Sequence, residues 1–142
     1  MDTVSGTVTL KWVDATFFVG SDSRGSTISI GYDRQREPNW NAVKPSDLLL
    51  MSAASCSMYD VVTILEKQRE PLDSLEVQCT GEQKTEPPYP FVSIHLKYFV
   101  KGAVDEQKLA RAITLSEDKY CSVLATLRPA VEITSSYEYV DP

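Results

Sequence analysis

The sequence predicts an α+β protein with an antiparallel sheet and one long apolar helix. Three observations support this class. Strand-like segments come in clusters rather than singly between helices, an apolar stretch with helix-start signals occupies residues 45–67, and an amphipathic helical pattern covers residues 104–120. With 142 residues, 42% hydrophobic and 24% charged, the chain has the size and composition of one globular domain, residues 1–142.

The N-terminal part of the chain predicts three strands. Segments 6–13, 16–21 and 26–32 are rich in β-branched and aromatic residues, and residues 21–25 supply the turn between the last two. Segment 33–45, DRQREPNWNAVKP, contains Pro38, ends at Pro45 and has no periodicity, which predicts a long loop. Loops of this length within a compact domain are often functional.

The long helix is predicted from 47 to 67, a length of about 30 Å. Pro45 and Ser46 are start signals, and Asp47 places a negative charge in the first turn, where it suits the helix dipole. Apolar residues cover almost the whole circumference of this helix, so we expect it to be buried on all sides. One sheet and two further helices can hardly cover it in a chain of this size, which predicts a homodimer with the helix at its centre.

The C-terminal part of the chain predicts two strands, two helical segments and a last strand. The strands are expected over 72–86, 91–102 and 131–140, with a helix over 104–120 and a short helical turn that begins at Cys121 and stops at Pro129. Alternation in the second of these strands points one set of side chains inward and His95 and Lys97 outward. The inward set is Val92, Ile94, Leu96, Tyr98 and Val100.

Composition excludes several classes of function. The net charge of −6, with no basic cluster beyond Arg34 and Arg36, argues against nucleic acid as a partner. Asp47, Asp60 and Glu66 make a membrane location of the long helix unfavourable, and the N-terminus has no signal-peptide pattern, so we expect a cytoplasmic protein. The chain has no glycine-rich phosphate loop and no close-paired metal-ligand spacing, so no cofactor and no metal are expected.

Three cysteines and one histidine are the candidates for chemistry. Cys79 lies on the inward phase of its strand and is interpreted as a small buried hydrophobe, and His95 as a solvated strand residue. Cys56 and Cys121 also permit the interpretation of inert core cysteines. Two details favour chemistry instead, since small residues surround Cys56 and Cys121 begins a helix, where exposed N–H groups favour a thiolate.

Two segments carry a resemblance to a known family. KPSDLLLMSAASCSMYDVVTILEKQR, which contains Cys56, and LSEDKYCSVLATL, which contains Cys121, resemble the two cysteine signatures of the OsmC/Ohr family of osmotically inducible and organic-hydroperoxide-resistance proteins. The predicted strand order is similar as well, so the resemblance extends from about residue 6 to residue 140. It implies an OsmC-like fold, an intertwined homodimer in which sheets with strands from both subunits wrap two long cysteine-bearing helices.

The chemistry that the resemblance implies is thiol peroxidase activity in stress defence. Cys56 would attack an organic hydroperoxide and become a sulfenic acid, Cys121 would condense with it to a disulfide, and a cellular dithiol would reduce the disulfide. The chain departs from the characterised peroxidases of the family, because KWVDATFF lacks their N-terminal arginine, and the nearest arginines are Arg24, Arg34 and Arg36. Their glutamate is also replaced, since residue 46 is serine and the carboxylate is Asp47, shorter by one methylene.

Asp47 therefore has two interpretations, a residue that orients an activating cation or a plain first-turn carboxylate. The function likewise keeps alternatives. The leading hypothesis is the peroxidase, with Cys56, Cys121 and Asp47 as its site. The second is a catalytically weak dimer that binds a small apolar ligand between its subunits, and a third, a cysteine hydrolase, is disfavoured because His95 lies on the outward phase of its strand.

Overall fold

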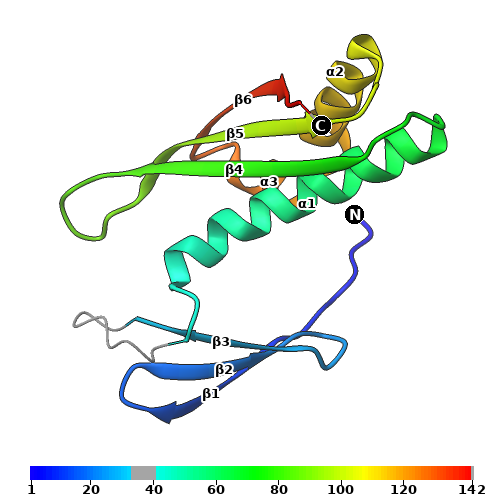
Figure 1. Cartoon of the computed structure of the whole chain (residues 1–142). Helices are drawn as coiled ribbons and strands as arrows, with labels where there is room; N and C mark the ends of the chain where they lie inside the picture. Colours follow the sequence, from blue (N-terminus) through cyan, green and yellow to red (C-terminus); the bar gives the residue numbers. More distant parts are fainter. Residues whose placement is uncertain (33–40, 142) are drawn as a thin grey trace. The chain divides into compact units, whose positions relative to one another are not determined.

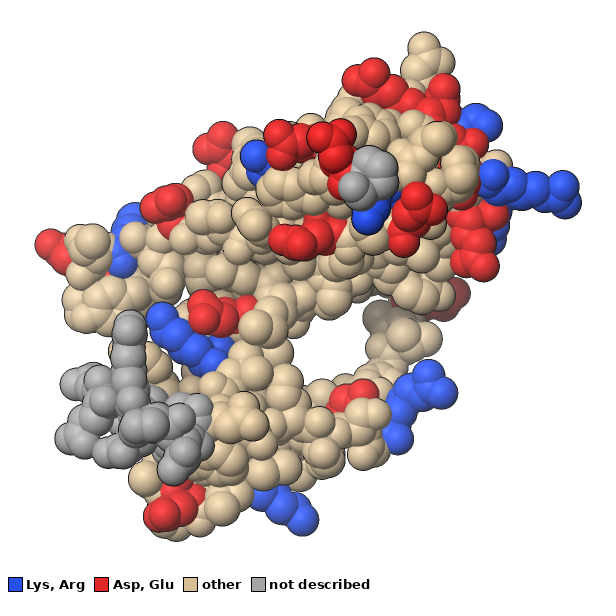
Figure 2. Space-filling model, viewed as in Figure 1, with Lys and Arg blue, Asp and Glu red and all other residues tan. Residues whose placement is uncertain are grey.

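The structure is a computed structural model that describes residues 1–32 and 41–141 and divides into two compact units, residues 1–49 and 50–142 (Figure 1). Its element order is three strands, a helix, two strands, three helical segments and a strand, so the predicted order and the mixed α+β class are confirmed. Most of the predicted loop, with Arg34 and Arg36, lies outside the described residues. Acidic and basic side chains are interspersed on the face drawn in Figure 2.

The first unit is built on a three-stranded antiparallel sheet. Its strands are β1 (Thr9–Asp14), β2 (Phe17–Ser21) and β3 (Thr27–Gly31), in the order β1-β2-β3. Val43 extends this sheet by an isolated parallel bridge to Ile30. β1 stays open to solvent, and its Leu10 and Trp12 are 57% and 70% exposed.

The long helix, α1 (Pro45–Lys67), confirms the predicted helix, which begins two residues earlier than expected. Within one chain it buries a single stripe at i, i+4 spacing, formed by Ala53, Ser57, Val61 and Leu65. The single chain therefore does not cover the helix on all sides, which agrees with the expectation that one chain of this size cannot. Tyr59 is 71% exposed, because the second unit covers the helix from one side only. By length and composition α1 would also pass for a membrane span, a test that core helices of soluble proteins pass as well.

The sheet of the second unit departs from the antiparallel prediction at one pair. β4 (Ser74–Gln83) and β5 (Phe91–Lys101) are antiparallel, whereas β6 (Glu132–Tyr139) runs parallel to β5. The helical segments between β5 and β6 form a crossover that returns the chain to the end of the sheet where β5 began. The inward set of β5 is confirmed except for Val92, which is 42% exposed because it lies at a register shift of the β4–β5 ladder and before the first β5–β6 pair.

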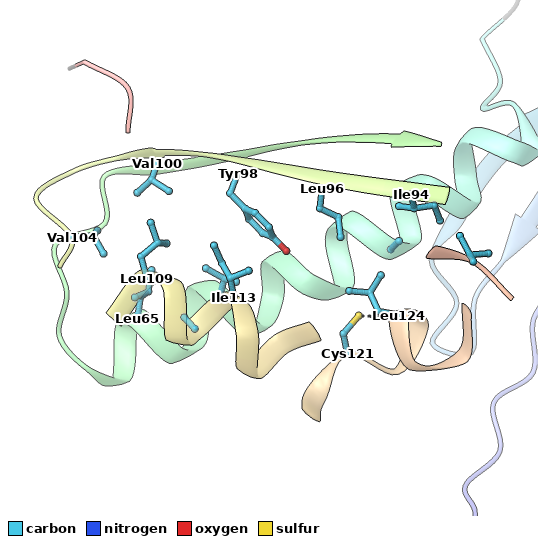
Figure 3. Close-up of a cluster of buried hydrophobic side chains, with 14 residues drawn as sticks. Leu65, Ile94, Leu96, Tyr98, Val100, Val104, Leu109, Ile113, Cys121 and Leu124 are labelled. Carbon is cyan, nitrogen blue, oxygen red and sulfur yellow. Dashed lines mark hydrogen bonds between the residues drawn. The ribbon is translucent and has the colours of Figure 1, made fainter. Parts of the chain in front are cut away.

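The crossover consists of α2 (Glu106–Leu115), a π-helical turn η1 (Ser116–Tyr120) and α3 (Ser122–Leu127). The Asp105 carboxylate caps α2 by accepting from the Lys108 N–H at 3.0 Å. The predicted helix over 104–120 therefore ends in a wider turn, and the predicted short helix after Cys121 is confirmed. Together the crossover, β5 and the buried stripe of α1 enclose the core, in which Cys121 lies beside Leu124 (Figure 3).

Candidate functional site

The second unit brings Cys56 and Cys121 together. Cys56 lies on α1, beside the buried stripe, and is half-buried, whereas Cys121 is the N-cap residue of α3 and is 2% exposed. Both thiols are free, and their side chains are hydrogen-bonded to each other. A pair in contact, with one member open to solvent, has the arrangement that a two-thiol reaction requires.

The N-terminus of α3 directs its first amides at the two sulfurs. The first N–H groups of any helix have no partner within the helix, so they are available to other acceptors. The Leu124 N–H donates to Cys121 Sγ at 3.4 Å, while the N–H groups of Val123 and Ser122 donate to the Cys56 sulfur. The hydroxyl of Ser122 lies 3.9 Å from Cys56 Sγ.

These contacts decide the ionisation of Cys56. Burial raises the pKa of its thiol and is the largest single influence. The Val123 N–H, the Cys121 side chain and the hydroxyl and N–H of Ser122 oppose it, and together they hold the pKa of Cys56 below its ordinary value. Backbone amides at the N-terminus of α3 thus favour the thiolate form of Cys56.

Cys121 has the opposite character. Burial and the neighbouring Cys56 raise the pKa of its thiol, the Leu124 N–H partly offsets them, and the net result is a pKa of about 11. At neutral pH, Cys56 is therefore the more ionised of the two sulfurs and Cys121 the protonated one. The pair thus contains one thiol that is readily ionised and one that stays protonated at neutral pH.

The other candidates from the sequence are Asp47, Cys79 and His95. Asp47 is exposed in the first turn of α1 and belongs to the first unit. Burial raises the pKa of Cys79, a half-buried strand residue that packs against the core. His95 Nδ1 and Nε2 lie 2.7 and 2.9 Å from the hydroxyl oxygens of Thr134 and Ser136. Across residues 1–32 and 41–141, no group of three or more His, Cys, Asp or Glu side chains could hold a metal ion.

Sequence reasoning missed Ser122, the residue with both a hydroxyl and an N–H at Cys56. A weak signal was present, because serine directly after a helix-starting cysteine is typical of a first helical turn. Its contact with a residue far back in the sequence depends on how α3 packs against α1, and the sequence pattern does not give that packing.

An α+β fold with two thiols in contact at a helix N-terminus defines a paired-thiol protein. The OsmC family model, described as OsmC-like protein, matches residues 37–136. The chain is 39% identical over 133 residues to Protein YhfA of Escherichia coli K12, covering 92% of this chain and 96% of that one. The chain belongs to the OsmC family.

Solved structures share the fold. A hypothetical protein from Aquifex aeolicus VF5 superposes with a TM-score of 0.82 at 30% identity, covering 97% of this chain and 99% of that one. The organic hydroperoxide resistance protein OhrB of Bacillus subtilis superposes with a TM-score of 0.68 at 13% identity, covering 95% of this chain and 98% of that one. At that identity the second likeness concerns the fold alone.

Proposed function

We propose that this protein is a thiol-dependent peroxidase that reduces organic hydroperoxides through a Cys56 sulfenate resolved by Cys121. The observation that carries the proposal is the division of roles within one pair of contacting thiols. Amides of α3 hold the pKa of Cys56 low, while burial holds the pKa of Cys121 high. Membership of a family that includes hydroperoxide-resistance proteins supports a redox role.

The proposed cycle begins with the Cys56 thiolate. Its sulfur attacks the terminal oxygen of ROOH, an S–O bond forms, the O–O bond breaks, and the departing alkoxide takes up a proton to give ROH. Cys121 then loses its proton and attacks the sulfenic sulfur, so that an S–S bond forms and hydroxide leaves as water. A cellular dithiol returns both cysteines to thiols by exchange and is itself oxidised to a disulfide.

The setting of the reaction is part of the proposal. We place the protein in the cytoplasm, where thiols are kept reduced, with no nucleic-acid or membrane partner. We also propose a homodimer, because Met51, Tyr59 and Val62 of α1 are 51%, 71% and 38% exposed, and a second copy would remove such apolar surface from water. Val62→Glu should shift the mass measured by light scattering from dimer to monomer, and a wild-type monomer at micromolar concentration would refute the dimer.

The test of the peroxidase is consumption of cumene or tert-butyl hydroperoxide with a dithiol reductant. Cys56→Ser should abolish turnover, and Cys79→Ser, the matched control, should leave it unchanged. In Cys121→Ser the sulfenic acid should accumulate and be trapped by a dimedone-type probe. A wild-type protein whose Cys56 is not oxidised by either peroxide would refute the proposal.

A proline variant tests how Cys56 is activated. Cys121 is extended, with φ −75° and ψ 106°, and Ser122 is the first helical residue, so this position suits proline. Ser122→Pro removes both the N–H and the hydroxyl that contact Cys56, whereas Ser122→Ala removes the hydroxyl alone. The thiol pKa of Cys56, titrated by ultraviolet absorbance, should rise more in the proline variant. Equal pKa values in the two variants would show that the Ser122 amide has no part in activation.

One observation supports binding of a small apolar ligand, within the chain rather than between subunits as the second hypothesis had it. The first unit has a cavity of about 310 Å³ with a largely apolar lining that includes Leu10, Ile28 and Leu48. If peroxide turnover is absent, an apolar fluorescent probe that binds the wild type and not Ile28→Glu would support this function.

A further inference from the structure

A chain of hydroxyl groups crosses the core of the second unit. The Tyr98 hydroxyl, which points from β5 toward α1, lies 2.5 Å from Ser57 Oγ (Figure 3). Ser116 Oγ lies 3.1 Å from Ser57 Oγ and 2.8 Å from Asp60 Oδ2. Ser57, Tyr98 and Ser116 are each fully buried, and we refer to these three residues as the hydroxyl cluster.

The hydroxyl cluster is an unexpected way to fill an apolar core. A buried hydroxyl costs free energy unless it is hydrogen-bonded. Replacing hydrogen-bonded partners with apolar residues of the same shape often leaves the folding free energy nearly unchanged. Directional hydrogen bonds instead fix how elements sit against one another. Here they join α1, β5 and η1 through one residue from each.

Both cysteines are attached to this cluster through the backbone. Ser57 directly follows Cys56 on α1, so a hydrogen bond that holds Ser57 also holds the turn that carries Cys56. The Ser116 carbonyl accepts from the Cys121 N–H at 2.7 Å, the bond that closes the π-helical turn. Ser116 thus contacts α1 with its side chain and anchors Cys121 with its main chain.

We propose that Ser57, Tyr98 and Ser116 are positioning residues that set the placement of Cys121 relative to Cys56 and thereby the ease with which the two sulfurs join. Turns with the π-helical pattern are frequent at functional sites. In this chain the turn lies between α2 and α3, and the Ser116 hydroxyl fixes its first residue to α1. Loss of one hydroxyl leaves the pair intact and lets the two backbones move apart.

The role of the cluster in a peroxide cycle rests on the proposed function, but its effect on disulfide closure does not. The exchange to be measured is reduced protein plus oxidised dithiothreitol, which gives protein disulfide plus reduced dithiothreitol. Both sides carry one disulfide and two thiols, so the equilibrium constant reports how well the two sulfurs are placed.

The variants are Tyr98→Phe and Ser116→Ala, each of which removes one hydroxyl. The matched controls are Tyr59→Phe, at a ring that is 71% exposed, and Ser55→Ala, whose hydroxyl contacts the Ser52 carbonyl at 3.4 Å. We expect the equilibrium constant for the Cys56–Cys121 disulfide to fall about tenfold in the first pair, close to 30 mV in potential, and to stay within twofold of wild type in the controls.

A second readout separates positioning from a general loss of structure. The rate at which iodoacetamide labels Cys79, a thiol on β4 outside the pair, should be unchanged in Tyr98→Phe, because a loosened pair leaves the β4–β5 ladder in place. Ser116→Thr keeps the hydroxyl, and its equilibrium constant should return toward that of wild type. Circular dichroism confirms that each variant is folded under the assay conditions.

Two results would overturn the inference. One is a disulfide equilibrium in Tyr98→Phe and Ser116→Ala within twofold of the controls, and the other is an equal loss in Ser116→Thr and Ser116→Ala. Oxidation of Cys56 by peroxide in Cys121→Ser decides the proposed function separately, because that step does not involve the closure of the disulfide.

Discussion

Selective alkylation of the two thiols tests the site most directly. The perturbation is a pH series in which reduced protein reacts with limiting iodoacetamide, and peptide mass spectrometry gives the labelling rate at each cysteine. The pKa of Cys121 is about 11 and that of an ordinary thiol is 9.0, while the pKa of Cys56 lies below the ordinary value. At pH 7 the thiolate fraction of Cys56 therefore exceeds that of Cys121 by at least about 100-fold.

Intrinsic nucleophilicity reduces this ratio. A thiolate of lower pKa is the weaker nucleophile. With a Brønsted coefficient of about 0.45, a pKa difference of two units lowers the rate constant of the thiolate about eightfold. At least about tenfold faster labelling of Cys56 remains, and the burial of Cys121 adds to it. As pH increases, the labelling rate of Cys56 should level off at a pH below the ordinary pKa of a thiol. The labelling rate of Cys121 should keep rising toward pH 11. Equal rates at pH 7, or the reverse order, would refute this division of roles.

Three further predictions concern stability and are measured by urea denaturation of the reduced protein. Leu96→Ala, at a fully buried core position, should cost about 2–5 kcal/mol, whereas Val92→Ala, at a residue that is 42% exposed, should cost less than about 1 kcal/mol. Similar losses would contradict this placement of the core. Gly102→Ala should cost about 2 kcal/mol or more, because φ is +124° and a Cβ would lie 2.2 Å from the Pro71 carbonyl oxygen, and a neutral result would show that the backbone there can relax. Burial raises the pKa of Glu117, and Glu117 Oε1 has no hydrogen-bond partner among the described residues. The protonated side chain therefore stabilises the folded state at acid pH, and this stabilisation is lost as pH rises through the raised pKa. Glu117→Gln should therefore be more stable than wild type at pH 7 and equal to it near pH 4, and a variant less stable at pH 7 would contradict this sign.

Much of the fold follows from local patterns. The apolar run after Pro45, the alternation in β5 and the amphipathic pattern before Ser116 each predict the element that the structure contains. The parallel pairing of β6 was missed because strand direction depends on the path of the crossover, which no local period records. The π-helical turn was missed because its five residues are too few for a sequence pattern to distinguish it from the end of an ordinary helix.

The candidate site was predictable as residues but not as an arrangement. The small residues around Cys56 and the helix start at Cys121 identified the pair. The groups that lower the pKa of Cys56 include the main-chain N–H groups of Ser122 and Val123. Almost every residue has such a group, so the sequence does not indicate which ones contact a thiol. The sequence led to the expectation of a cation that lowers the pKa of Cys56, whereas in the structure backbone amides lower it. Ser57 and Ser116 were likewise invisible as partners until the packing of α1 against η1 was known.

The crossover between β5 and β6 carries Cys121, so the thiol pair assembles only when this segment packs against α1. β6 can join the sheet only after the intervening segment has crossed over the core, so this contact spans a long stretch of chain and forms slowly. Before that, Cys56 and Cys79 are already present in a partly folded chain, and Cys121 is not yet at its position. An oxidant that acts at this stage would join the wrong cysteines. The order in which the elements pack thus bears on which of the three cysteines meet first.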